Sequence, residues 1–151
     1  MSSPVSAPDL AQRPPRSPRI RLGGYAILPR LLDKGRAHLA GKVGEYIFNS
    51  GLDKRFFTFV KIEADALLAQ LAAGKGDGEI LAWINDNAGH KPGDWEIAQW
   101  SAFQEARTAT TVKAREGTAK QLATLAPNRI DVVTGFDFLD LDDHVSFGGK
   151  A

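Results

Sequence analysis

The 151-residue sequence contains no cysteine, which excludes disulfide bonds, thiolate nucleophiles and cysteine-based metal sites. Histidine is scarce as well, and its three positions are His38, His90 and His144. No two of these residues have the HxxxH or HExxH spacing of common metal-binding helices. We therefore predict no metal site and no cofactor.

Long apolar runs are also missing, since none approaches the ~18 residues that a membrane-spanning helix requires. The first ten residues lack the basic and apolar regions of a secretory signal, so we expect a cytoplasmic protein that binds no membrane. The net charge of +1 argues against a general nucleic-acid binder. Charged residues make up 25% and hydrophobic residues 43%, as in ordinary globular proteins, and the length fits one domain.

The N-terminal part of the chain is rich in proline and arginine. Each proline fixes its own φ angle and disfavours helix in the residue before it. These prolines are Pro14, Pro15 and Pro18. We predict that residues 10–28 form an extended arm over the core of a single helical domain, residues 10–151, and that residues 1–9 are a disordered tail.

Apolar residues at helical spacing predict an all-α fold of five or six short, irregularly packed helices. The predicted helices span residues 29–40, 53–62, 64–73, 78–87, 94–109 and 118–125. Asp77 is expected to cap the fourth helix. Gly35 interrupts the first helix at a cost of about 1 kcal/mol relative to alanine, unless another segment packs closely against it.

The C-terminal residues 130–143 are ambiguous. Their β-branched residues and the alternating FDFLDLDD sequence fit a short C-terminal hairpin. A lone two-stranded hairpin is only marginally stable, so we favour a helix there.

Charge is distributed unevenly along the chain. Residues 10–42 contain six arginines and two lysines against one acid, Asp33, whereas residues 130–145 contain five aspartates and no lysine or arginine. One interpretation is that the two ends pack together and neutralise each other.

The arginines of the arm also suit a binding site for a small anionic metabolite. Guanidinium groups bind carboxylates and phosphates through paired hydrogen bonds, and adjacent glycines allow an oxyanion to approach the backbone. Our leading hypothesis is a non-catalytic anion-binding or interaction module. Its predicted ligand-binding residues are Arg19, Arg21, Gly23, Gly24, Tyr25 and Arg36. The alternative is that these arginines pair with the C-terminal aspartates and clamp the arm to the domain.

A second hypothesis is a small enzyme that acts on a phosphorylated or carboxylated metabolite. Asp33 or Glu45 would be the base and His38 the acid, while the arginines would hold the substrate. This hypothesis requires the three side chains to share one concave pocket.

A third hypothesis is a homo-oligomer or a protein that binds a partner through Trp95 or the acidic C-terminal tail. Trp83 and Trp100 lie on the apolar stripes of their helices and are expected in the core. Trp95 lies off its stripe, so we expect it on the surface.

Four segments carry a resemblance to a known family. They are RPPRSPRIRLGGYAILPRLLDKGRAHLAGKVGEY from Arg13 to Tyr46, followed by LDKRFFTFV, EILAWI and AQWSAF. Through these segments the chain resembles a bacterial family known as domain of unknown function 5069. The resemblance covers nearly the whole chain. The resemblance implies that relatives often carry a histidine near Ile47 and Cys-Pro near Ser50–Gly51, and it implies no particular activity.

Overall fold

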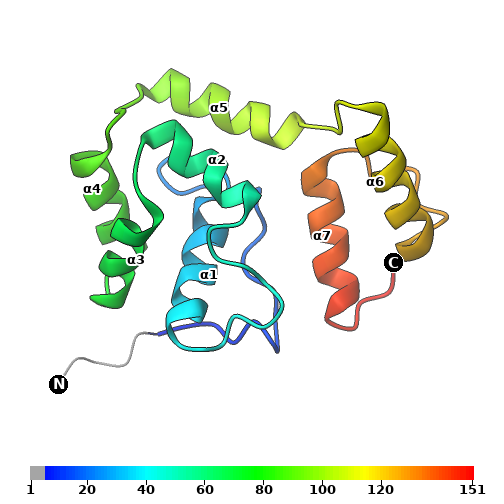
Figure 1. The fold of residues 1–151 in the computed structure, drawn as a ribbon, viewed down its shortest axis with the longest axis horizontal. Coiled ribbons are helices and arrows are strands. Elements are labelled where there is room, and N and C mark those ends of the chain that lie inside the picture. The colour runs from blue at the N-terminus through cyan, green and yellow to red at the C-terminus, as the bar shows by residue number, and fades with distance from the viewer. Residues whose placement is uncertain (1–5) are drawn as a thin grey trace.

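Residues 6–151 are described here from a computed structural model, so residues 1–5 of the predicted tail lie outside the described part. The described residues form seven α-helices and no β-strand (Figure 1). The helices are α1 (Leu28–Leu39), α2 (Gly51–Val60), α3 (Ala64–Ala72), α4 (Asp77–Asn87), α5 (Asp94–Ala106), α6 (Val112–Leu125) and α7 (Gly135–Ser146). The all-α prediction is confirmed, with one helix more than the predicted five or six.

The helices are arranged around α1, which lies near the middle of the molecule (Figure 1). Helices α3 and α4 lie on one side of α1, and α7 and α6 lie on the other. Helix α5 runs across one end of this arrangement and connects the two sides. As a result, α7 lies on the side of α1 opposite α3 and α4, although α7 is distant from α1 in the sequence.

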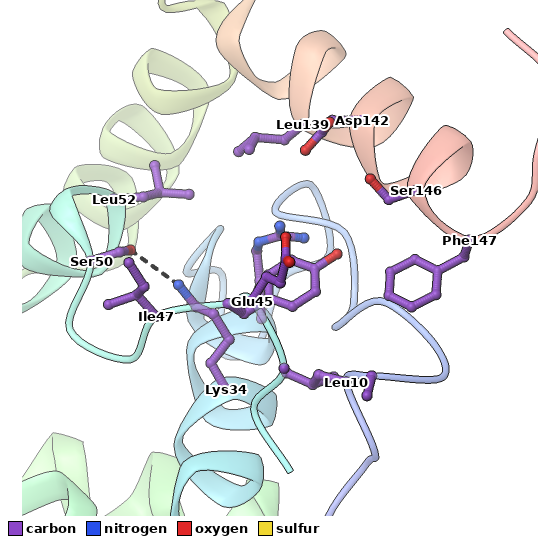
Figure 2. Close-up of a pocket in the computed structure, with 14 residues that line it drawn as sticks. Leu10, Lys34, Glu45, Ile47, Ser50, Leu52, Leu139, Asp142, Ser146 and Phe147 are labelled. Atoms are coloured by element: carbon purple, nitrogen blue, oxygen red, sulfur yellow. Dashed lines mark hydrogen bonds between the residues drawn. The ribbon is translucent and has the colours of Figure 1, made fainter. Parts of the chain in front are cut away.

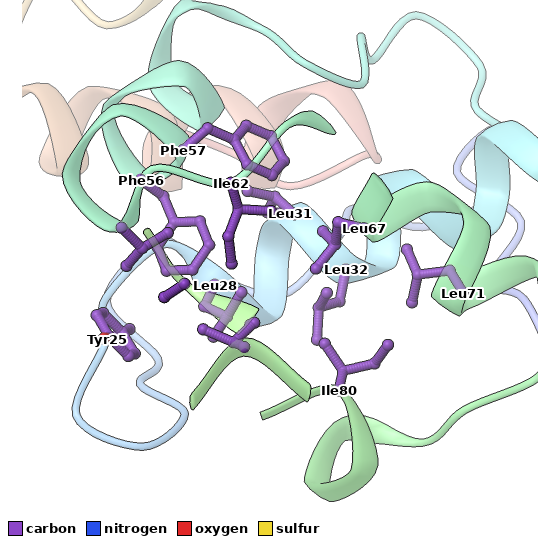
Figure 3. Close-up of a cluster of buried hydrophobic side chains, with 13 residues drawn as sticks. Tyr25, Leu28, Leu31, Leu32, Phe56, Phe57, Ile62, Leu67, Leu71 and Ile80 are labelled. Atoms are coloured by element: carbon purple, nitrogen blue, oxygen red, sulfur yellow. The ribbon is translucent and has the colours of Figure 1, made fainter. Parts of the chain in front are cut away.

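The main hydrophobic core forms where α1 packs against α2 and α3, and α4 packs against α3 (Figure 3). Its buried members are Tyr25, Leu28, Leu31, Leu32, Phe56, Phe57, Val60, Ile62, Leu67, Leu71, Ile80, Ile84 and Ala88. Helix α1 is buried over most of its surface, which includes two charged residues, Arg30 and Lys34. Charged groups in so buried a helix are energetically unfavourable without partners.

Gly35 allows α1 and α3 to approach each other closely. A Cβ atom at Gly35 would lie 2.5 Å from Leu71 Cδ1 and 3.2 Å from Phe48 Cε2. The close neighbour that would justify a glycine inside this helix is therefore present.

Two helix starts differ from the predictions because of capping interactions. Helix α2 begins at Gly51 rather than Asp53, since Ser50 Oγ accepts a hydrogen bond from Asp53 N and the Asp53 carboxylate accepts one from Ser50 N. Asp77 is not the N-cap of α4 as predicted. Gly76 occupies that position and Asp77 is the first helical residue.

The C-terminal third also differs from the predictions. Helix α6 begins at Val112 rather than residue 118, because Thr111 Oγ1 accepts a hydrogen bond from Ala114 N. None of its residues is buried, which explains the weak apolar pattern of this segment. Helix α5 ends at Ala106 rather than residue 109. The favoured helix is confirmed for residues 135–143 by α7, whereas residues 130–134 are not helical, and the alternative of a hairpin is wrong for the described residues.

The arm lies against the helices through its apolar residues. Leu10, Pro15 and Pro18 are buried, and Leu10 N donates a 2.9 Å hydrogen bond to Lys42 O. Gly23 and Gly24 adopt positive φ angles in the tight turn that brings Leu22 and Tyr25 together in an isolated bridge. None of the helices in residues 6–151 has the length and apolar character needed to cross a bilayer.

Candidate functional site

The arginines at the start of the chain bind carboxylates from its other end. Arg19 forms ion pairs with Asp137 and Asp140 of α7, and its Nε lies 2.9 Å from Asp140 Oδ2. Arg21 Nη2 lies 3.0 Å from Glu105 Oε1 of α5. The interpretation that the charged ends of the chain neutralise each other is confirmed for Arg19.

A second group of ion pairs joins the arm to α1 and α4. Arg16 donates to Asp33 and to Asp77, with Nη1 2.8 Å from Asp77 Oδ2. Arg36 Nη1 lies 2.8 Å from the other oxygen of Asp77. Burial favours the neutral form of Asp77, but the hydrogen bonds and positive charges of its two arginines outweigh burial and lower its pKa.

The six predicted ligand-binding residues do not line a common cavity in the described structure. Tyr25 is only 2% exposed and packs edge-on against Phe56 in the core, with ring centroids 5.2 Å apart. Gly23 and Gly24 lie against the side chains of Leu81 and Ile97. Arg19 borders a cavity of about 360 Å³ and Arg36 borders another of about 440 Å³.

The three residues of the enzyme hypothesis are also dispersed. Asp33 binds Arg16, and the His38 ring stacks on Phe48 with centroids 5.9 Å apart. Glu45 borders a different cavity, which contains neither Asp33 nor His38. Trp95 is 66% exposed, as predicted from its position off the apolar stripe. Its role in binding a partner stays a prediction, as does that of the acidic C-terminal tail.

A cavity of about 750 Å³ lies between α1, the segment from Gly44 to Leu52, and α7 (Figure 2). We call it the α1–α7 cavity. Its lining residues are Leu10, Ala11, Arg30, Lys34, Gly44, Glu45, Tyr46, Ile47, Ser50, Leu52, Leu139, Asp142, Ser146 and Phe147. This volume is in the range typical of small-molecule binding sites.

Lys34 contributes a buried ammonium group to the wall of this cavity. Its side chain is 5% exposed, and its Nζ lies 3.1 Å from Ser50 Oγ (Figure 2). The same Nζ lies 2.9 Å from Asp53 Oδ2. Burial lowers the pKa of Lys34, and the positive charge of Arg30 acts in the same direction. The carboxylate of Asp53 opposes this shift but does not cancel it.

Arg30 lies one turn before Lys34 on α1 and is buried as well. Its Nη1 lies 2.7 Å from Asp143 Oδ2, and its guanidinium carbon lies 5.4 Å from the centre of the Tyr46 ring. The Tyr46 hydroxyl donates a 2.6 Å hydrogen bond to Asp143 Oδ1. Burial and the Asp143 carboxylate raise the pKa of Tyr46, so this hydroxyl stays protonated as a donor.

The remaining wall of the cavity combines acidic and apolar groups. Glu45 is exposed at its edge, and Asp142 on α7 is half-buried. Burial and the neighbouring Asp143 raise the pKa of Asp142 above its ordinary value. The apolar part of the lining includes Leu52 on α2 and Leu139 on α7 (Figure 2).

Of the residues that the sequence predicted for a site, only Glu45 lines the α1–α7 cavity. Sequence analysis missed Arg30, Lys34 and Asp53. The available signal was a pair of basic residues four positions apart beside the leucines of the same helix, because charges that are buried with such leucines need partners. Ile47 and Ser50, the positions where the resemblance implies different residues in relatives, also lie in this lining.

The fold and the cavity define an all-α protein in which two buried cations of one helix line a cavity closed by the C-terminal helix. The sequence profile of a family described as "Domain of unknown function (DUF5069)" matches residues 12–145, and the chain belongs to this family. A search of curated proteins finds no match.

Proposed function

We propose that the protein is a cytoplasmic binding protein for a small monocarboxylate, and that the ligand occupies the α1–α7 cavity. This keeps the class of function expected from the sequence, a small-anion-binding module, and moves the site from the arm to the cavity. The observation that carries the proposal is the pair of buried cations, Arg30 and Lys34, on the wall of one cavity. Asp143 and Asp53 neutralise their charges, so the attraction for an anionic ligand comes from the N–H donors that these carboxylates leave unpaired.

Both cations keep hydrogen-bonding capacity beyond their internal partners. Among the described residues, the acceptors of the Lys34 ammonium are Ser50 and Asp53, which account for two of its three N–H groups. Arg30 donates to Asp143 through both terminal nitrogens, but its Nε has no described acceptor. These remaining donors suit a carboxylate oxygen.

The acidic residues of the cavity limit the charge of the ligand. Glu45 and Asp142 repel a doubly charged phosphate more strongly than a singly charged carboxylate. The side chains of Leu52 and Leu139 offer contact to a short apolar chain. A small monocarboxylate therefore fits the lining better than a phosphorylated compound.

Thermal melts of the full chain with a panel of monocarboxylates test this proposal. A ligand at 100 times its dissociation constant stabilises the fold by about 2.7 kcal/mol, which corresponds to a Tm increase of roughly 5–10 °C for a chain of this size. Leu139→Trp should fill the cavity and abolish the increase. Leu39→Trp is the matched control, because Leu39 is partly exposed at the end of α1 and does not line the cavity.

The proposal predicts that Leu39→Trp keeps the ligand response and that Leu139→Trp loses it while still unfolding cooperatively. An equal response in both variants would show that the carboxylate binds elsewhere. The absence of any response of the wild-type protein to the whole panel would refute the proposed function.

A further inference from the structure

We infer that Lys34 forms an imine with the carbonyl carbon of a 2-oxo acid bound in the α1–α7 cavity. This inference rests on the proposed function and narrows its ligand to a carboxylate that carries a neighbouring carbonyl group. It gives Lys34 a covalent role in addition to its ion pair with Asp53.

The position of Lys34 provides both access and a fixed geometry. Its side chain lines the cavity and points toward Ser50 (Figure 2). Its Nζ is held by Ser50 and Asp53. A lysine whose amine is fixed by two partners has already lost most of the conformational freedom that a reaction would otherwise remove. Arg30, one turn earlier on the same helix, is placed to bind the carboxylate of the ligand.

Asp53 is suited to take a proton from Lys34. Its Oδ2 lies 2.9 Å from Lys34 Nζ. Its Oδ1 is fully buried and has no hydrogen-bond partner among the described residues. A buried oxygen without a partner is unfavourable for a purely structural ion pair, and such groups call for an explanation in function.

The surroundings also favour the neutral amine that the reaction needs. The charged groups near Lys34 are Asp53 on α2, Arg30 on α1 and Asp143 on α7, and the same cavity contains Glu45 and Asp142. Burial and Arg30 together lower the pKa of Lys34 despite the carboxylates. Each unit by which the pKa of a lysine is lowered increases the fraction of neutral amine at pH 7 about tenfold over that of an exposed lysine.

The reaction balances without an additional reagent. Lys34 transfers a proton to Asp53, and the neutral Nζ attacks the carbonyl carbon of the oxo acid to form a C–N bond. The carbonyl oxygen takes up two protons, one from the amine nitrogen and one from Asp53, which becomes a carboxylate again, and the oxygen leaves as water while the C=N bond forms. The product is a protonated imine, so the positive charge opposite Asp53 is preserved.

Reductive trapping tests this inference on the full-length protein. The protein is incubated with pyruvate and sodium cyanoborohydride near pH 7, and the intact mass and the modified peptide are determined by mass spectrometry. We expect one adduct per chain, with a mass gain equal to that of the oxo acid less one oxygen atom, located at Lys34. Lys34→Arg should lose the adduct, whereas Lys42→Arg, at an exposed lysine outside the cavity, should keep it.

Peptide mapping of the wild-type protein keeps the test decisive even if Lys34→Arg does not fold. Adducts spread over exposed lysines, or no adduct at all, would refute the imine. Melts with lactate, which has no carbonyl group, separate this failure from that of the proposed function. A Tm increase with lactate but no trapping with pyruvate would refute the imine and support carboxylate binding. No response to either compound would refute both.

Discussion

Replacement of Gly35 by alanine sets two opposite effects against each other within one helix. Alanine is the better helix former by about 1 kcal/mol. A Cβ atom at Gly35, however, would lie 2.5 Å from Leu71 Cδ1, which is fully buried and cannot move into solvent. Overpacking of this kind costs typically 1–3 kcal/mol.

The expected net result of Gly35→Ala is therefore a loss of about 1 kcal/mol in the free energy of unfolding. For a chain of this size the loss corresponds to a Tm decrease of roughly 2–4 °C. Gly117→Ala provides a matched control, because Gly117 also lies inside a helix and its Cβ would have no neighbour within 4 Å. This control should raise the free energy of unfolding by about 1 kcal/mol.

Urea unfolding of Gly35→Ala and Gly117→Ala measures whether the free energy of unfolding falls in the first variant and rises in the second. The same measurement in a Leu71→Ala background identifies its cause, because the shortened side chain leaves room for the new Cβ. In that background Gly35→Ala is expected to stabilise the protein. If Gly35→Ala raised stability in the wild-type background as much as Gly117→Ala does, the close contact between α1 and α3 would not limit residue 35.

Three further predictions concern buried and charged groups, each measured by urea unfolding. Arg30→Met removes one partner of the buried pair with Asp143 and should lower the free energy of unfolding by about 3–5 kcal/mol. Ser101→Ala removes the hydroxyl that accepts a 2.9 Å hydrogen bond from the buried Ala26 N, and it should lower the free energy of unfolding by about 1–3 kcal/mol. A decrease of less than about 0.5 kcal/mol would show that this hydrogen bond does not stabilise the fold. The pKa of Asp77 is lower in the folded than in the unfolded state, so its contribution is complete above about pH 4 and disappears as pH falls through the folded value. Asp77→Asn should therefore make stability less dependent on pH between about pH 5 and pH 2, and an unchanged acid dependence would contradict this.

Apolar spacing predicted the first five helices because α1 to α4 each bury apolar side chains and α5 packs Ile97 and Trp100 against the core. Helix α6 lacks this signal, since none of its residues is buried, and only its capping threonine indicates the true start. Helix starts were misplaced where a side chain caps the helix, as at Ser50 and Thr111. These interactions depend on one or two residues and leave the apolar pattern unchanged.

The candidate site was harder to predict than the fold. The arginines of the arm are conspicuous because they cluster in sequence, yet Arg19 and Arg21 bind carboxylates of α7 and α5. Lys34 and Asp53 are distant in sequence and individually ordinary. The packing of α1 against α2 brings them together, and no local pattern of residues encodes that contact.

The arm and the cavity are connected through α7, which provides one wall of the cavity and also binds Arg19. An exposed ion pair contributes at most about 1 kcal/mol, whereas the buried pair of Arg30 with Asp143 holds the same helix more strongly. The double variant Arg19→Ala/Arg21→Ala should therefore leave α7 in place. Its Tm should fall by only a few degrees, and its response to a monocarboxylate should persist.

This double variant separates the two interpretations of the arm that the sequence left open. If the arm is a clamp, ligand-induced Tm increases in the variant equal those of the wild-type protein at each ligand concentration. If the arm is itself the anion site, the increases disappear while cooperative unfolding is retained. Because each tenfold change in dissociation constant corresponds to about 1.4 kcal/mol, a titration that compares apparent affinities detects even a partial role. The burial of Arg30 and Lys34, against the half-exposed side chains of Arg19 and Arg21, favours the first outcome.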